Sequence, residues 1–178
     1  MTISEQAQSY AKDRHRAVMQ LYDGEPYEFH LTMVASTAME YLKLIPEQDW
    51  DVVVAACWVH DVIEDCRETY NDVTKNTCKE VAEIAYALTN EKGKTRADRA
   101  NEKYYQGIRD TPYATFVKLC DRIANIRHSR AKGSRMIEVY RKEHEDFKKK
   151  LWFPAYEEMF HYMDYLLAEQ KHEKTATP

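Results

Sequence analysis

One short segment concentrates side chains that could do chemistry. His60, Asp61, Glu64 and Asp65 directly follow the apolar run WDVVVAACWV. If the segment is one helix, residues four apart share a face, so His60 stands over Glu64 and the two aspartates stack in the same way. Because a divalent cation would offset the repulsion among the carboxylates, the segment predicts a metal site. Imidazole with carboxylate suits manganese, iron or zinc. For this segment alone, an acidic helix end facing solvent is the simpler alternative.

Two further candidate ligands lie far away along the chain. His30 follows the turn residues in GEPYEFH, and Asp121 lies within VKLCDRIANI. At helical spacing, Lys118, Asp121 and Asn125 share a stripe beside the apolar face of their segment. A lone histidine is more often structural than a ligand, and a lone aspartate is more often solvated or paired. Each residue alone is therefore weak evidence for a metal site. The interpretation depends on the order in which all the candidate ligands occur.

The order H…HD…D resembles that of the HD-domain metal-dependent phosphohydrolases. The closest resemblance is to the hydrolase half of RelA/SpoT-type alarmone enzymes and to the small alarmone hydrolases. Five segments carry it, in the family's order and with similar gaps, over roughly residues 5–130: GEPYEFH, VHDVIEDC, EVAEIAYALTN, ANEKYYQGI and FVKLCDRIANIRHS. HDxxED together with KLxDRxxN is considerably more specific than a His-Asp pair alone.

The resemblance implies roles for individual residues. It implies four metal ligands, normally to Mn²⁺ although Fe²⁺ or Zn²⁺ would also suit: His30, His60, Asp61 and Asp121. Glu64 and Asp65 match the acidic pair that orients or activates the attacking water. Asn125 matches a residue that lines the nucleotide pocket. We expect burial among like charges to raise the pKa of Glu64 or Asp65, so that one of them can exchange a proton.

Basic residues that could neutralise phosphoryl oxygens occur near these motifs. EKGKTRADR contains Lys92, Lys94, Arg96 and Arg99, and Lys118 and Arg122 flank Asp121. Each is as easily an ordinary surface charge, so the sequence assigns none of them to the site.

The chain departs from the family pattern around the expected base pocket. Leu21, Tyr22 and Asp23 in QLYDGEPY stand where alarmone hydrolases usually have basic and hydroxyl residues. Tyr22 could stack on a base instead. Ala124 and His128 replace the usual His and Thr. We therefore expect intact catalytic residues and altered substrate recognition.

Three functional hypotheses follow. The leading one is a manganese-dependent phosphohydrolase that removes the 3′-pyrophosphate of a guanosine alarmone such as (p)ppGpp. The second keeps the metal and acts as a nucleotidase or phosphatase on another (deoxy)nucleotide or an NADPH-like cofactor. The third is a catalytically inactive HD protein that binds a nucleotide or a partner. A site without activity has no need of clustered charge, which argues against the third.

Composition and periodicity indicate the fold. The 178 residues contain only 4 Gly and 5 Pro, and 31% are charged, which favours long helices. We predict an all-α HD-domain bundle of about seven or eight helices in one domain, residues 1–178. The family-like core spans about 5–130, a helical extension about 131–172, and a disordered tail about 173–178.

Helical periodicity places the expected elements. Helices are predicted at 4–20, 27–42, 49–66, 78–90, 95–109, 112–129, 134–150 and 154–171. RETYNDVTKNT is predicted to be a loop, with Thr77 as the N-cap of the next helix and Pro26 opening the second one. On the helix with Asp121, Phe116, Leu119 and Ile123 are expected to face inward.

Charge and cysteine content limit the setting. A net charge of −4 argues against binding of polymeric nucleic acid, and four dispersed cysteines indicate reduced thiols. The polar N-terminal segment and the absence of a long apolar run predict a cytoplasmic protein without membrane contact. The apolar stripe of residues 147–167 is explained most simply by packing on the core, and it could also form a homodimer face or cover the pocket.

Overall fold

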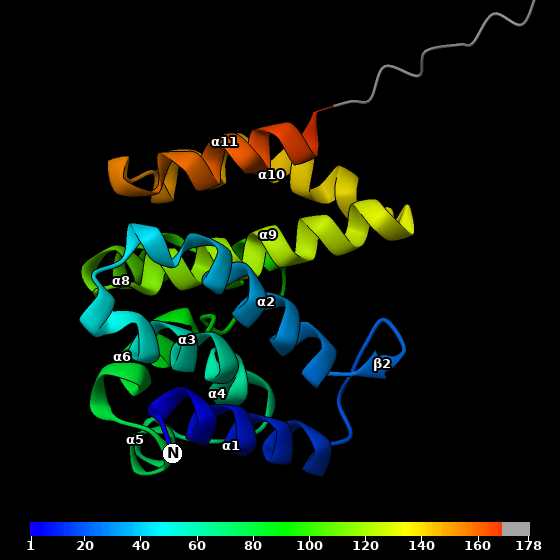
Figure 1. Ribbon diagram of the computed structural model, residues 1–178. Coiled ribbons are helices and arrows are strands. Elements are labelled where there is room, and N and C mark those ends of the chain that lie inside the picture. Colours follow the sequence, from blue (N-terminus) through cyan, green and yellow to red (C-terminus); the bar gives the residue numbers. More distant parts are fainter. Residues whose placement is uncertain (169–178) are drawn as a thin grey trace, which may run out of the picture.

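Helices account for nearly all regular structure in the computed structural model, which describes residues 1–168 (Figure 1). The described part of the chain forms eleven α-helices: α1 (Ile3–Ala17), α2 (Glu28–Tyr41), α3 (Trp50–Val59), α4 (Val62–Asp65), α5 (Tyr70–Asn76), α6 (Lys79–Leu88), α7 (Arg96–Arg99), α8 (Glu102–Asp110), α9 (Ala114–Lys132), α10 (Met136–Leu151) and α11 (Glu157–Leu167). Short 3-10 turns occur at η1 (Leu42–Leu44), η2 (Glu47–Asp49) and η3 (Pro154–Tyr156). The predicted all-α class is confirmed.

The long helix α9 lies at the centre of the bundle. It packs against α2, α3 and α6 on one side and against α10 and α11 on the other, as Figure 1 shows. The predicted inward residues Phe116, Leu119 and Ile123 are all fully buried. Helix α1 packs on α3 at the far side of the bundle. Because α9 contacts both layers, any residue near its middle lies close to several other helices.

A small hairpin projects beside the start of α2 (Figure 1). Strands β1 (Leu21–Tyr22) and β2 (Glu25–Pro26) pair in antiparallel register. Asp23 and Gly24 connect them with positive φ angles of 51° and 87°, as two-residue hairpin turns require. Pro26 therefore belongs to β2 and does not open α2 as predicted, because the hairpin extends the chain up to Tyr27.

The segment predicted to be a loop contains a helix. In α5, the hydroxyl of Thr69 accepts the backbone N–H of Asp72, and the carboxylate of Asp72 accepts the N–H of Thr69. This reciprocal capping box stabilises a helix start within a polar segment that has little apolar periodicity. Thr77 ends α5, and Cys78 takes the N-cap position of α6 that was predicted for Thr77.

The predicted helix at 95–109 is divided into α7 and α8. Asn101 accepts the backbone N–H of Tyr104 with its side chain and so starts α8 as a new helix. The last two predicted helices are found as α10 and α11, whereas the tail predicted at about 173–178 lies outside the described residues. Within residues 1–168, no helix combines the length and the apolar character needed to cross a bilayer.

Candidate metal centre

Three side chains from separate helical segments converge beside the middle of α9. His30 lies in the first turn of α2, His60 follows the last residue of α3, and Asp121 lies within α9. Packing of α2 and α3 on α9 and on each other brings these positions together. One donor atom from each residue lies within 4.8 Å of the other two, and all three residues are buried.

Asp61 joins this cluster because the helix is interrupted. One continuous helix from residue 49 to residue 66 was predicted, but α3 ends at Val59 and α4 begins at Val62. At this break, Asp61 Oδ2 lies 2.9 Å from His60 Nε2 and 3.7 Å from His30 Nε2. The stacking of His60 over Glu64 was expected for one continuous helix, which the structure does not have. Asp61 and Asp65 keep their spacing, since the Asp61 carbonyl accepts the Asp65 N–H at 2.9 Å.

The orientation of His60 suits a metal ligand. Its Nδ1 lies 2.9 Å from the Cys57 carbonyl oxygen, which can only accept, so Nδ1 carries the proton. Nε2 therefore faces Asp61 and Asp121, where it can bind a cation when it carries no proton. This atom is buried and has no hydrogen-bond partner within residues 1–168, although Asp61 Oδ2 is close. A divalent cation between these atoms would satisfy it.

The charges of the cluster also fit a cation. Burial lowers the pKa of His60, but Asp61 and Asp121 outweigh burial and raise the pKa to about 10. Burial raises the pKa of Asp61, whereas His60 lowers it more strongly, so the net shift is downward. The pKa of Asp121 is also lowered, because Lys118 and the histidines outweigh burial. Two ionised carboxylates therefore face two imidazoles, a donor set typical of manganese, iron or zinc.

Tyrosines from the hairpin region surround this centre. The Tyr27 hydroxyl donates to Asp61 Oδ2 at 2.5 Å. The Tyr22 hydroxyl donates to Asn125 Oδ1 at 2.7 Å, and Asn125 Nδ2 donates to Asp121 Oδ1 at 2.6 Å. Tyr22 and Asn125, which were predicted to contact the substrate, both line the cleft. Their hydrogen bonds link them to Asp121 of the metal centre.

The predicted acidic pair lies at the rim of the same cleft. Glu64 accepts the backbone N–H and the side-chain amide of Asn90, each at 3.1 Å. Asp65 Oδ2 accepts Gln20 Nε2 at 2.7 Å, and Gln20 Oε1 lies 2.6 Å from Nδ1 of the buried His15. Partial burial and the neighbouring Asp61 raise the pKa of Asp65. Glu64 and Asp65 are therefore held differently, and Asp65 is the member whose pKa shifts in the predicted direction.

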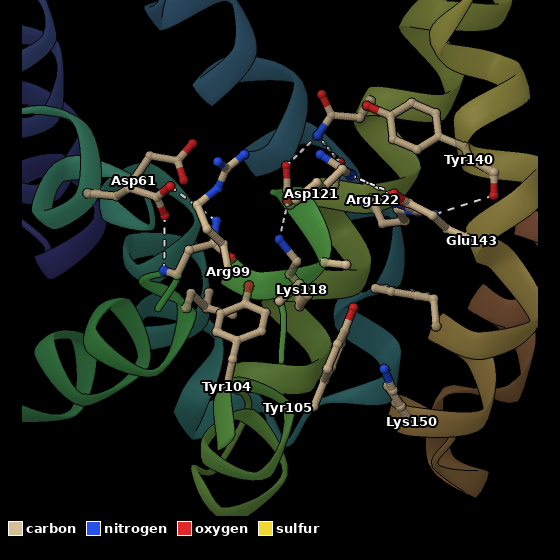
Figure 2. Close-up of a pocket in the computed structure, with 18 of the residues that line it drawn as sticks. Asp61, Arg99, Tyr104, Tyr105, Lys118, Asp121, Arg122, Tyr140, Glu143 and Lys150 are labelled. Atoms are coloured by element: carbon tan, nitrogen blue, oxygen red, sulfur yellow. Dashed lines mark hydrogen bonds and ion pairs between the residues drawn. The ribbon is translucent and has the colours of Figure 1, made fainter. Parts of the chain in front are cut away.

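A cleft of about 600 Å³ opens from the metal centre toward α7, α8 and α10. Figure 2 shows Lys118 pointing to Asp121, and Nζ of Lys118 lies 2.9 Å from Asp121 Oδ2. The lining includes six cationic residues: Arg96, Arg99, Lys118, Arg122, Lys142 and Lys150. It also includes five tyrosines and one phenylalanine: Tyr22, Tyr27, Tyr104, Tyr105, Tyr140 and Phe147.

The wall opposite the metal centre is organised by Glu143 of α10. Glu143 accepts Arg96 Nε at 2.6 Å and Arg122 Nη1 at 2.9 Å, and Figure 2 shows it facing Arg122. The Arg122 guanidinium lies 4.5 Å from the ring centre of Tyr140 and 4.8 Å from that of Phe147. Helix α10 therefore both packs on the core and covers part of the pocket, which the sequence had left as alternatives.

Sequence reasoning missed most of this wall. Arg96 and Arg99 were considered but not assigned, and Lys92 and Lys94 do not line the cleft. Lys142 and Lys150 lie in a segment that was interpreted as a packing helix. Their i,i+4 spacing with Asp146 places all three on one face, which is the one signal that could have indicated a second face of α10 with a separate role.

Comparison with known proteins is consistent with this geometry. A family model described as "HD domain" matches residues 7–147, which reaches into α10 and beyond the last motif found in the sequence. A solved structure described as "A metazoan ortholog of SpoT hydrolyzes ppGpp and plays a role in starvation responses" is similar, with a TM-score of 0.72. The match covers 93% of this chain and 94% of that chain at 19% sequence identity, so it shows a shared fold.

Proposed function

The chain belongs to the HD domain family, and on this premise we propose that it is a metal-dependent phosphohydrolase acting on a small phosphorylated nucleotide. The observation that carries the proposal is the convergence of His30, His60 and Asp121, with donor atoms within 4.8 Å of one another, at one end of a cleft lined by cations. Asp61, 2.9 Å from His60, completes the set of four expected ligands. We propose Mn²⁺ as the metal, and Fe²⁺ or Zn²⁺ fit the same donors.

The residues around the metal centre have different proposed roles in hydrolysis. The bound cation would polarise the phosphoryl group and favour attack by water. Asp65 is the residue that we assign to proton transfer, because its pKa is raised and Gln20 occupies Oδ2, which leaves Oδ1 for the proton. We assign to Glu64, which is hydrogen-bonded to Asn90, the positioning of the rim of the cleft next to Asp65. Lys118 supplies positive charge beside the reacting group.

The remaining lining favours a nucleotide over inorganic phosphate or a sugar phosphate. A cleft of about 600 Å³ is large enough for a nucleotide. Tyrosine rings can stack on a base, and the cations of α7, α9 and α10 can pair with phosphates distant from the reacting one. A ligand that spans the cleft would therefore contact both the metal centre and α10.

We propose a guanosine alarmone such as (p)ppGpp as the substrate, with release of its 3′-pyrophosphate. The order and spacing of the motifs in residues 5–130 support this choice. The structurally similar metazoan protein is described as hydrolysing ppGpp. Identity of 19% is too low to transfer a substrate, so the assignment depends on direct assay.

Another phosphorylated nucleotide or an NADPH-like cofactor is the second candidate. It is favoured by two departures from the family pattern, Asp23 in the hairpin and His128 on α9. Asp23 Oδ2 lies 2.8 Å from His128 Nε2, so the two departures contact each other. This contact lies next to Tyr22, in the segment where the alarmone hydrolase pattern has basic and hydroxyl residues.

A panel of substrates decides among these functions. The full chain is assayed with Mn²⁺ against ppGpp, pppGpp, nucleoside mono- and triphosphates and NADPH, with separate detection of phosphate and pyrophosphate. Release of pyrophosphate from ppGpp supports the leading proposal, whereas release of phosphate from another compound supports the second. Asp61→Ala should abolish turnover with nearly unchanged helical circular dichroism. If no compound is hydrolysed with Mn²⁺, Fe²⁺ or Zn²⁺, the inactive binding protein becomes the better interpretation.

A further inference from the structure

Tyr22 is attached to two different parts of the metal centre. Its ring stacks on the ring of His30, with centroids 4.7 Å apart and planes inclined by 16°. Its hydroxyl donates to Asn125 Oδ1 at 2.7 Å. One side chain thus contacts a candidate ligand from α2 and, through Asn125, reaches a candidate ligand from α9.

Asn125 links Tyr22 to Asp121 because its side-chain amide has one allowed orientation. Nδ2 donates to Asp121 Oδ1 at 2.6 Å and to the Asp121 carbonyl oxygen at 3.0 Å. If the amide were flipped, its oxygen would face these two acceptors, which is repulsive. Oδ1 must therefore point to Tyr22. Because Oδ1 can only accept, the Tyr22 hydroxyl is the donor in this contact.

The hairpin holds Tyr22 in place from its other side. The next residue, Asp23, lies 2.8 Å from His128 Nε2 on α9, one turn beyond Asn125. The Tyr22 ring also meets the His128 ring edge-on, with centroids 5.0 Å apart. With Asp23 and Gly24 in positive-φ conformations, the turn is short, and the Asp23–His128 contact restricts the position of Tyr22.

We propose that Tyr22 is a positioning residue of the metal centre, which fixes Asp121 through Asn125 and His30 through ring stacking. The inference rests on the proposed metal site and adds a role that binding of a base would not require. One face of the Tyr22 ring is already covered by His30. Groups that orient metal ligands in this way typically change metal affinity by about 10- to 100-fold when they are removed.

Direct measurement of metal binding tests the proposal. Mn²⁺ is titrated calorimetrically into the metal-stripped full chain, for wild type and for Tyr22→Phe, which keeps the ring and removes the hydroxyl. We expect the Mn²⁺ affinity of Tyr22→Phe to fall about 10-fold. Tyr22→Leu, which also removes the stacking on His30, should lose more.

A matched control removes a tyrosine hydroxyl elsewhere. The Tyr113 hydroxyl donates to Asp49 at 2.6 Å, in a part-buried contact that does not line the cleft. Tyr113→Phe should therefore bind Mn²⁺ with wild-type affinity. A loss of affinity in Tyr22→Phe that is absent in Tyr113→Phe separates positioning of the centre from general loss of packing.

A double-mutant cycle identifies the route through Asn125. Asn125→Leu breaks the middle link, so adding Tyr22→Phe to it should change the Mn²⁺ affinity little further. Additive losses would overturn the proposed route, and wild-type affinity in Tyr22→Phe would overturn the inference while leaving the metal site intact. If wild type itself binds no Mn²⁺, Fe²⁺ or Zn²⁺, the proposed function fails first, and the inference fails with it.

Discussion

The two ends of the cleft are built in different ways. At the metal centre, His30, His60 and Asp121 are only 2%, 3% and 8% exposed. At the opposite wall, Arg96 and Lys142 are exposed side chains on α7 and α10. Buried ionisable groups need matched partners, so each position tolerates few residue types, whereas an exposed cation needs only to lie near the ligand. The types of residue at the metal centre are therefore restricted, whereas many combinations of exposed cations could form the opposite wall.

The largest effect is expected from Asp121→Asn at the metal centre. The substitution keeps the volume of the side chain and removes the charge that faces both histidines and Lys118. We expect loss of Mn²⁺ binding and a fall in turnover of about 1,000-fold or more, because the metal contributes several kcal/mol to the transition state. Steady-state kinetics and calorimetric titration measure both. Turnover within about 10-fold of wild type would remove the metal centre from the proposed chemistry.

Lys118 lies in the cleft lining beside Asp121, and its removal tests how far the metal centre depends on this ion pair. Burial lowers the pKa of its ammonium, but Asp121 outweighs burial and raises the pKa well above its usual value. In the metal-free protein, Lys118→Met should lower the free energy of unfolding by about 3 kcal/mol, since a buried carboxylate loses its partner. Urea denaturation with and without Mn²⁺ measures this.

The same experiment distinguishes pairing from packing. Bound Mn²⁺ would take over neutralisation of Asp121, so saturating Mn²⁺ should reduce the difference between Lys118→Met and wild type. An unchanged difference would mean that Lys118 stabilises the fold by contacts other than its charge.

This contrast explains what the sequence could predict. His30, His60, Asp61 and Asp121 were found because their types and order are restricted by chemistry, and the helices followed from periodicity. The interruption of the helix at His60 and Asp61 was not predicted, since tertiary packing overrides a run with uniform apolar character. Burial of the cluster depends on α2, α3 and α9 meeting, which local patterns do not contain.

The wall was less predictable for a physical reason. Lys142 and Lys150 resemble ordinary solvated lysines in sequence, and their proximity to Arg96 depends on how α10 folds back onto α9. Glu143, which joins Arg96 and Arg122, lies in a helix outside any recognised motif. Exposed charges acquire a role only from the tertiary arrangement, so single-sequence reasoning rightly left them unassigned.

A smaller effect is expected at an exposed cation of the cleft lining. Arg99→Gln removes a cation from the cleft lining, and we expect KM to rise about 3- to 10-fold with little change in kcat, as for loss of one solvent-accessible phosphate contact. Lys94→Gln is the matched control, because Lys94 is exposed in the same segment and does not line the cleft. A larger fall in kcat than rise in KM would contradict the division between chemistry and recognition.

The smallest effect is expected at Asp164, which connects α11 to α10, the helix that carries the wall. Asp164 of α11 lies 2.7 Å from Lys148 Nζ and 2.6 Å from His144 Nε2, both on α10. Burial raises the pKa of Asp164, but Lys148 and His144 outweigh it and lower the pKa. A carboxyl whose pKa is lower in the folded state stabilises above its unfolded pKa of about 4, and the stabilisation disappears as pH falls through the folded pKa. Since 38% of the Asp164 side chain is exposed, we expect Asp164→Asn to cost less than about 1 kcal/mol at pH 7.

Denaturation of Asp164→Asn as a function of pH checks the sign. The difference from wild type should shrink progressively below about pH 4, and Asp146→Asn, which breaks a more exposed pair with Lys150, should cost less at every pH. Growth of the difference at low pH would contradict the proposed ion pairs. Helix α10 carries Lys142 and Glu143. A rise in KM for Asp164→Asn without a fall in kcat would therefore show that the contacts of Asp164 with α10 position the wall. An unchanged KM would mean that the contact of Glu143 with Arg122 positions α10 by itself.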